Sequence, residues 1–160
     1  MSSESAPFTR EVVHPTHGVL GWLCVDSWVG GLAFGGFRMT PHVTRLEVEE
    51  LARCMTLKLA AHGSPTGGAK AGIRMDPKAE DAPEKLAYFA GQLSELLRGH
   101  VVLGKDMGAT DAAIDAMYAS IQSTQLAPIA PAPCARLRDF AGYRRHMTGL
   151  GVAFATRAAL

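Results

Sequence analysis

One helix followed closely by one strand constrains the fold most. Thr44-Arg45-Leu46-Glu47 has the Ser/Thr-x-x-Glu form of a capping box, so we predict a helix from Thr44 to about Ala61. His62-Gly63-Ser64-Pro65 ends it, and Gly67-Gly68 opens a predicted strand that runs to Ile73 before Asp76-Pro77. A helix returning directly into a strand is typical of α/β domains.

The flanking segments extend this alternation. We predict a β-rich region from Val19, a helix over 81–98 capped by Asp81, a buried strand at 101–103 and a helix over 111–122. The prolines in 125–138 favour an extended connection, and 148–160 has the pattern of a helix. The order of elements predicts an α/β layer domain with a partly parallel sheet.

Composition excludes several classes of protein. The 160 residues suit one domain, and a net charge of +1 without a basic block argues against a nucleic-acid partner. Cys24, Cys54 and Cys134 are odd in number and widely spaced, which favours free thiols in a reducing cytoplasm. His14 and His17 lack a carboxylate or cysteine beside them, so we predict no metal site. We also expect no membrane partner, because no apolar run is long enough and the N-terminus is polar.

Two lysines and an aspartate are the candidate catalytic residues. Lys58 continues a helical stripe with Leu51 and Met55, and Lys70 follows the glycine pair of the next strand. We expect both amines to enter one cleft, where like charges would lower at least one lysine pKa. Asp106 ends another apolar run and would trade protons. In the alternative interpretation, Lys58 merely reaches solvent from the helix end and Asp106 caps the following helix.

Glycines crowd the region before the first helix. Gly30, Gly31, Gly35 and Gly36 fall within seven residues. Glycines at this density mark either a tightly packed hairpin or a place where a ligand approaches the backbone. The spacing alone leaves both interpretations open.

Several short motifs, in order and with matching gaps, resemble the N-terminal domain of the glutamate/leucine/phenylalanine/valine dehydrogenase family. They are Gly35-Gly36-Phe37-Arg38-Met39, Met55-Thr56-Leu57-Lys58, Gly67-Gly68-Ala69-Lys70, Asp76-Pro77 and Asp106-Met107-Gly108. The resemblance covers about residues 19–160. It implies a three-layer α/β/α fold with a mixed, mostly parallel sheet, and an enzyme that oxidatively deaminates an L-amino acid to a 2-oxo acid with NAD or NADP.

The resemblance also implies roles for single residues. Lys58 would bind the substrate α-carboxylate, Lys70 would activate water, and Asp106 would relay protons. Thr148 would lie near both the nicotinamide and the substrate. The other positions implied to bind substrate are Gly35, Gly36, Met55 and Phe34.

Phe34 departs from the glutamate-specific branch. A lysine at this position pairs there with the substrate's side-chain carboxylate, and burying a carboxylate against an aromatic ring would cost several kcal/mol. We therefore expect an apolar substrate. The stretch from Gly67 to Ile73 is nearer to the glutamate branch, so the subfamily stays open.

Length is the second departure, because no glycine-rich dinucleotide fingerprint follows residue 148. We expect an N-terminal arm or edge element over 1–16, a substrate-binding and dimerisation domain over 17–147, and the start of a helix toward a missing Rossmann domain over 148–160. Such a chain would form at least a homodimer, bind no cofactor alone and need a separate Rossmann domain for turnover. The alternative is a stand-alone module that binds an amino acid or 2-oxo acid or only assembles.

Overall fold

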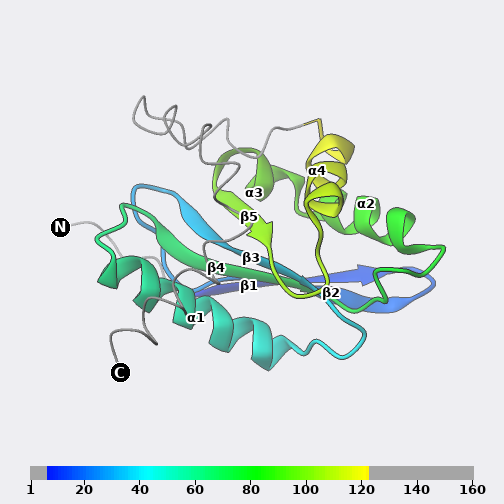
Figure 1. Cartoon of the computed structure of the whole chain (residues 1–160), viewed down its shortest axis with the longest axis horizontal. Helices are drawn as coiled ribbons and strands as arrows, with labels where there is room; N and C mark the ends of the chain where they lie inside the picture. Colours follow the sequence, from blue (N-terminus) through cyan, green and yellow to red (C-terminus); the bar gives the residue numbers. More distant parts are fainter. Residues whose placement is uncertain (1–6, 123–160) are drawn as a thin grey trace, which may run out of the picture. The chain divides into compact units, whose positions relative to one another are not determined.

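A computed structural model describes residues 7–122 of the chain. Strands and helices alternate along this part of the sequence (Figure 1). The elements are β1 (Phe8–His14), β2 (Gly18–Val25), β3 (Ala33–Met39), α1 (Arg45–Ala61), β4 (Gly67–Ile73), α2 (Ala82–Gln92), α3 (Ser94–Gly99), β5 (Val101–Lys105) and α4 (Asp111–Ser120).

The five strands form one mixed sheet in the order β1-β2-β4-β3-β5. β3 pairs in parallel with both β4 and β5, whereas β2 is antiparallel to β1 and β4. α1 covers one face of the sheet, and α2, α3 and α4 lie on the other (Figure 1). This arrangement confirms the predicted three-layer α/β/α fold with a mixed sheet. β1 is an edge strand, so the part of the N-terminal segment from Phe8 to His14 is an edge element.

The two faces of the sheet bury very different cores. The face under α2, α3 and α4 holds the larger cluster, in which the rings of Phe37 and Phe89 lie 5.6 Å apart. The α1 face has a smaller cluster because glycines and charged side chains from β3 and β4 occupy much of it. That smaller cluster consists of Trp22, Cys24, Val43, Val48 and Ala52.

Helix α1 begins and ends where the sequence predicts. The Glu47 amide donates to Thr44 Oγ1 at 3.2 Å, as a capping box requires. The reciprocal half is missing because the Glu47 carboxylate binds the guanidinium of Arg38 instead. At the other end, Gly63 takes a positive φ of 64° and its amide donates to the Ala60 carbonyl.

The buried stripe of α1 differs from the predicted one. Val48 and Ala52 are fully buried, and Thr56 packs so closely on Gly68 that a Cβ there would lie 2.2 Å from the Thr56 nitrogen. The predicted stripe starts on half-buried Leu51 and Met55 and ends on exposed Lys58. It therefore lies along the flank of the helix rather than beneath it.

The predicted helix over 81–98 is wrong in one respect, because it is broken at Leu93. Leu93 closes α2 and begins α3, with its amide bonded to the Ala90 carbonyl. Its side chain is buried, so packing compensates for the interrupted helix. Asp81 stands at the predicted N-cap but makes no capping bond, since its carboxylate pairs with Lys85 at 2.6 Å.

Other local predictions can be compared with the described residues. Gly30 and Gly31 have positive φ angles of 60° and 76° in a tight turn closed by Val29 and Leu32, so the hairpin interpretation holds for this pair. Within residues 7–122, no helix combines the length and apolar character needed to cross a membrane. The predicted extended segment 125–138 and the helix 148–160, with Cys134 and Thr148, lie outside the described residues.

Candidate active site

Lys70 lies in the middle of β4, on the face that α1 covers. Strand register places it directly beside Gly36 of β3, and Gly36 in turn lies beside Gly104 of β5. Two neighbouring positions on this face therefore carry no side chain. A long side chain from β4 can extend across β3 only where such space exists.

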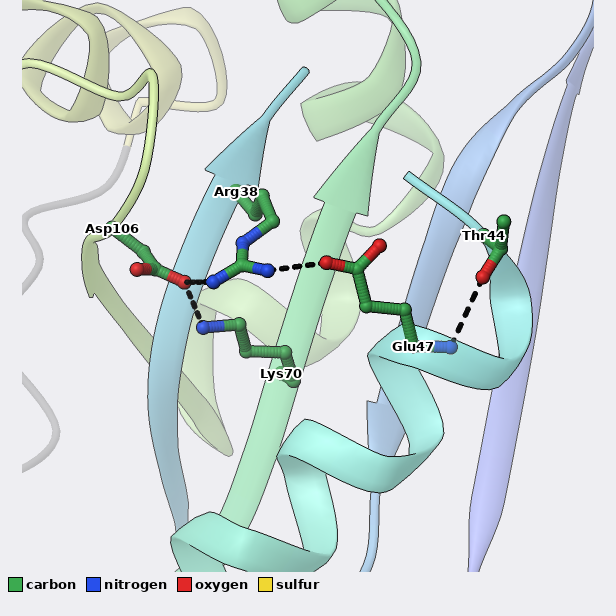
Figure 2. Close-up of polar contacts among 5 residues, drawn as sticks. All are labelled: Arg38, Thr44, Glu47, Lys70 and Asp106. Atoms are coloured by element: carbon green, nitrogen blue, oxygen red, sulfur yellow. Dashed lines mark hydrogen bonds and ion pairs between the residues drawn. The ribbon is translucent and has the colours of Figure 1, made fainter. Parts of the chain in front are cut away.

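The Lys70 amine crosses Gly36 and donates a hydrogen bond to Asp106 Oδ2, just beyond the end of β5 (Figure 2). A Cβ at position 36 would lie 3.0 Å from Lys70 Nζ and 3.1 Å from Asp106 Cβ, which is too close without adjustment. Gly36 thus gives the pair its path. This contact confirms that the predicted lysine and aspartate come together.

Gly35 and Gly36 serve different needs. Gly35 is buried, and a Cβ there would lie 1.8 Å from the Ala69 carbonyl oxygen, so packing within the sheet requires glycine at this position. Gly36 is half-buried, and its open side faces the ion pair. The ion pair therefore requires glycine at position 36, whereas sheet packing requires it at position 35.

Arg38 and Glu47 extend the pair into a cluster of four charged residues. Arg38 Nη2 lies 3.3 Å from Asp106 Oδ2, the oxygen that also accepts from Lys70, and Arg38 Nη1 binds Glu47 Oε1. Figure 2 shows the guanidinium between the two carboxylates, one from α1 and one beyond β5. Two cations and two carboxylates leave the cluster without net charge, as a partly buried site requires.

Asp106 is held in its ionised form. Its burial by itself would raise the carboxyl pKa, but the hydrogen bond from Lys70, a backbone hydrogen bond from Met107 and the charges of Lys70 and Arg38 outweigh that effect. The pKa of Asp106 therefore lies below its ordinary value. The Lys70 side chain is 7% exposed and that of Asp106 is 26% exposed, so water reaches the pair from the carboxylate side.

The turn that carries Asp106 is fastened to the end of β3. The Met39 amide donates to the Met107 carbonyl at 2.9 Å. Gly108 has a φ of 77°, and a Cβ there would lie 1.9 Å from the Met39 oxygen. Thr110 caps α4 by accepting from the Ala113 amide at 3.1 Å, so Asp106 does not serve as the helix cap.

The remaining predicted residues surround the pair less directly. Phe34 lies on β3 two residues before Gly36 and is half-buried, with its ring tip about 4.0 Å from where a Cβ of Gly104 would stand. Met55 is half-buried on the flank of α1. Lys58 is exposed, and its amine forms no hydrogen bond or ion pair with a residue in the described range. Lys70 binds a carboxylate, and the expectation that the amine of Lys58 enters the same cleft stays a prediction.

Sequence reasoning missed Arg38 and Glu47. Arg38 belongs to a motif quoted for the family resemblance, and its spacing from Gly36 places it on the same face of β3 as the site. That alternation was a usable signal. Glu47 gave no such signal, because the capping box already accounted for a glutamate at the third position of a helix.

A dinucleotide does not fit the described residues. Such a cofactor needs a strand, a glycine-rich turn and a helix N-terminus in succession. The connections from β3 to α1 and from β4 to α2 contain no glycine, and the turn from β5 to α4 contains one, Gly108. Residues 7–122 thus contain no pyrophosphate site of this kind.

A separate surface hollow lies between β1, β2 and the first half of α1. Glu49 lines it and accepts hydrogen bonds from Thr9 at 2.9 Å and Arg45 at 2.8 Å. Burial raises the pKa of the Cys24 thiol at its floor. The hollow does not include the residues of the four-charge cluster.

Comparison with known proteins gives the same assignment as the motifs. A family model described as Glu/Leu/Phe/Val dehydrogenase, dimerisation domain, matches residues 10–123. The chain is 35% identical over 100 residues to a phenylalanine dehydrogenase of Caldalkalibacillus thermarum, covering 60% of this chain and 27% of the relative. It is 35% identical over 147 residues to glutamate dehydrogenase B of Halobacterium salinarum, covering 88% of this chain and 34% of the relative.

Solved structures show the same fold. A hetero-hexameric glutamate dehydrogenase from Thermus thermophilus aligns with a TM-score of 0.61 and 30% identity over 74% of this chain and 31% of its own. An L-tryptophan dehydrogenase from Nostoc punctiforme gives a TM-score of 0.62 at 20% identity, covering 72% of this chain and 35% of its own. The chain thus spans about a quarter to a third of the length of these relatives. It belongs to the Glu/Leu/Phe/Val dehydrogenase family and carries that family's dimerisation domain.

Proposed function

We propose that this chain is the substrate-binding and self-associating part of an NAD(P)-dependent L-amino-acid dehydrogenase. The observation that carries the proposal is the Lys70–Asp106 pair, which reaches across Gly36 on a partly solvated face of the sheet. A buried ammonium joined to a partly exposed carboxylate is suited to moving protons between a ligand and water. NAD or NADP would bind elsewhere, because the described residues fit no dinucleotide.

Deamination moves protons in sequence at one carbon. Water loses one proton as it adds to the protonated imine; the resulting hydroxyl group loses the second as the C–N bond breaks, and the departing nitrogen gains one, so that a 2-oxo acid, ammonia and one net proton are released. Lys70 would accept the first proton, since a neutral amine at this position can serve as a base. Asp106 would return a proton from solvent, because a quarter of its side chain is exposed whereas Lys70 is nearly covered.

The substrate head group needs a cation besides Lys70, whose charge is already met by Asp106. Lys58 is the proposed partner of the α-carboxylate, since it is exposed and forms no ion pair with a described residue. It shares the flank of α1 with Met55 and with Glu47, whose carboxylate extends over the sheet to Arg38. Phe34, on the same face of β3, would contact an apolar substrate side chain.

Calorimetric titration of the chain with 2-oxo acids and amino acids tests the site. We expect 2-oxo acids with apolar side chains to bind, and Lys58→Ala to weaken binding at least about tenfold through loss of a charge-assisted contact. Lys85→Ala is the matched control, because it removes the same charge from α2 on the other side of the sheet. Heats that are equal for wild type and Lys58→Ala would remove Lys58 from the site.

Turnover and assembly need separate measurements. NADH formation after mixing the chain with a separately produced Rossmann domain of the family would support the dehydrogenase, provided that a complex is shown to form. Sedimentation should show at least a dimer. A chain that binds 2-oxo acids but never restores turnover in such a complex would instead fit the second candidate, a binding and assembly module that uses the same residues.

A further inference from the structure

A single carboxylate oxygen lies between two cations in this structure. Oδ2 of Asp106 accepts from Lys70 Nζ and lies 3.3 Å from Arg38 Nη2. One cation would suffice to neutralise an aspartate that is partly exposed. The second, Arg38, is already balanced by Glu47, so charge balance alone does not explain its additional contact with Asp106.

The two cations differ in whether they can lose a proton. A lysine amine can act as a base, whereas an arginine guanidinium stays charged throughout the pH range of proteins. Whenever Lys70 is neutral, its attraction for Asp106 falls, and burial of the carboxylate then favours uptake of a proton. Among the described residues, Arg38 is the one cationic partner of Asp106 whose charge persists through that step.

The guanidinium is fixed from its other end. Arg38 Nη1 binds Glu47 Oε1 on α1, and the Arg38 side chain is only 16% exposed. Its Nε is buried without a hydrogen-bond partner in the described part of the chain, so the two terminal nitrogens carry its contacts. An arginine held in this way loses little further side-chain entropy when it contacts Asp106.

We infer that Arg38 is a positioning residue that keeps Asp106 ionised and directed at the site while Lys70 lacks its proton. The inference rests on the proposed function, since it concerns the same proton transfer. Arg38 itself need not touch the substrate. Its charge makes the protonation of the Asp106 carboxylate less dependent on the protonation of the Lys70 amine, so that the two groups can exchange protons with different partners.

Titration of Asp106 in the whole chain tests this without any ligand. We would label aspartate with ¹³C, assign the Asp106 carboxyl signal with Asp106→Asn and follow it with pH by NMR. Lys70→Met imitates an uncharged lysine. The midpoint of the Asp106 titration in Lys70→Met should lie at least about one pH unit below the midpoint in Lys70→Met/Arg38→Met, because only the first variant keeps Arg38. One pH unit corresponds to a tenfold difference in proton affinity. Equal midpoints in the two variants would overturn the inference.

The charged groups around Asp106 supply the controls. They are Lys70 from β4, Arg38 from β3, Glu47 from α1 and the Lys105–Asp111 pair, whose atoms are 2.7 Å apart. In the Lys70→Met background, Glu47→Gln should not raise the midpoint, because the cation stays. Arg38→Lys should restore part of the low midpoint through its charge. A rise with Glu47→Gln as large as with Arg38→Met would show a general disturbance and overturn the inference.

Folding and function remain separable in this design. Far-UV circular dichroism checks each variant, and Arg38→Gln replaces Arg38→Met if the latter fails to fold. A normal Asp106 shift in a chain that binds no 2-oxo acid would refute the proposed function alone. Equal midpoints in a chain that does bind 2-oxo acids would refute the role of Arg38 alone.

Discussion

Replacing Asp106 by asparagine should destabilise the fold much more than replacing Lys70 by methionine, although both changes break the same pair. The Lys70 side chain is 7% exposed and Asp106 is 26% exposed. Asp106→Asn leaves a covered ammonium next to a neutral amide and the positive Arg38. Lys70→Met leaves a partly solvated carboxylate that keeps Arg38 at 3.3 Å. The stranded charge is buried in the first variant and hydrated in the second.

The structure sets the expected magnitudes. Breaking a fully buried pair costs about 3–5 kcal/mol, and we expect about 2–3 kcal/mol for Asp106→Asn because the site is partly wet and the amide oxygen still accepts a hydrogen bond. Lys70→Met should cost less than about 1 kcal/mol, since methionine fills the same space and the carboxylate keeps a partner. The double variant should regain most of the Asp106→Asn loss, because no ammonium remains.

Urea unfolding at neutral pH measures these differences, with unchanged slopes as the check on two-state behaviour. The pH dependence gives a second test. The pKa of Asp106 is lowered in the folded chain, so its stabilising contribution is present above the unfolded value of about 4 and is lost as pH falls through the folded value. The gap between wild type and Asp106→Asn should narrow only in that acid range. Equal losses for the two single variants, or a larger loss for Lys70→Met, would refute the reasoning.

Three further predictions concern the residues around the pair. Gly36→Ala should fold but weaken 2-oxo acid binding by about tenfold in the calorimetric titration, because its Cβ would lie 3.0 Å from Lys70 Nζ. Gly104→Ala is the control and should bind normally, since the nearest atom to its Cβ would be 3.9 Å away. Gly68→Ala should lower the free energy of unfolding by about 2–3 kcal/mol in urea, since its Cβ would lie 2.2 Å from a backbone nitrogen of α1. Phe34→Lys should shift binding by about tenfold toward 2-oxo acids with a second carboxylate, and an unchanged preference would remove residue 34 from the specificity pocket.

Local signals in the sequence were enough to predict α1 and β4. The Thr44 cap, the Gly63 stop and the glycine pair at Gly67 each act within a few residues, so they can be read without a fold. The break at Leu93 carries only a weak signal, which is Gly91 two residues before it. A single glycine is tolerated inside a helix, so packing against the sheet is what distinguishes two short helices from one long helix.

The sequence predicted two of the four charged residues of the site but not their contacts. Lys70 and Asp106 were correctly placed together, although Lys70 lies in the middle of its strand and reaches Asp106 only because Gly36 leaves room. The contacts of Arg38 depend on strand register and on the path from β3 into α1, which a sequence motif does not contain. For the same reason the amine of Lys58 could be placed on a helix but not opposite a partner.

The incomplete capping box of α1 ties the helix to the charge cluster. Glu47 belongs to the first turn of α1, yet its carboxylate is committed to Arg38 rather than to the helix start. An anion that drew the guanidinium away would release this glutamate to close its own helix end. The conformation of the first turn of α1 would then change when an anion binds at the charge cluster. A spectroscopic label near Thr44 would report this binding without contacting the ligand.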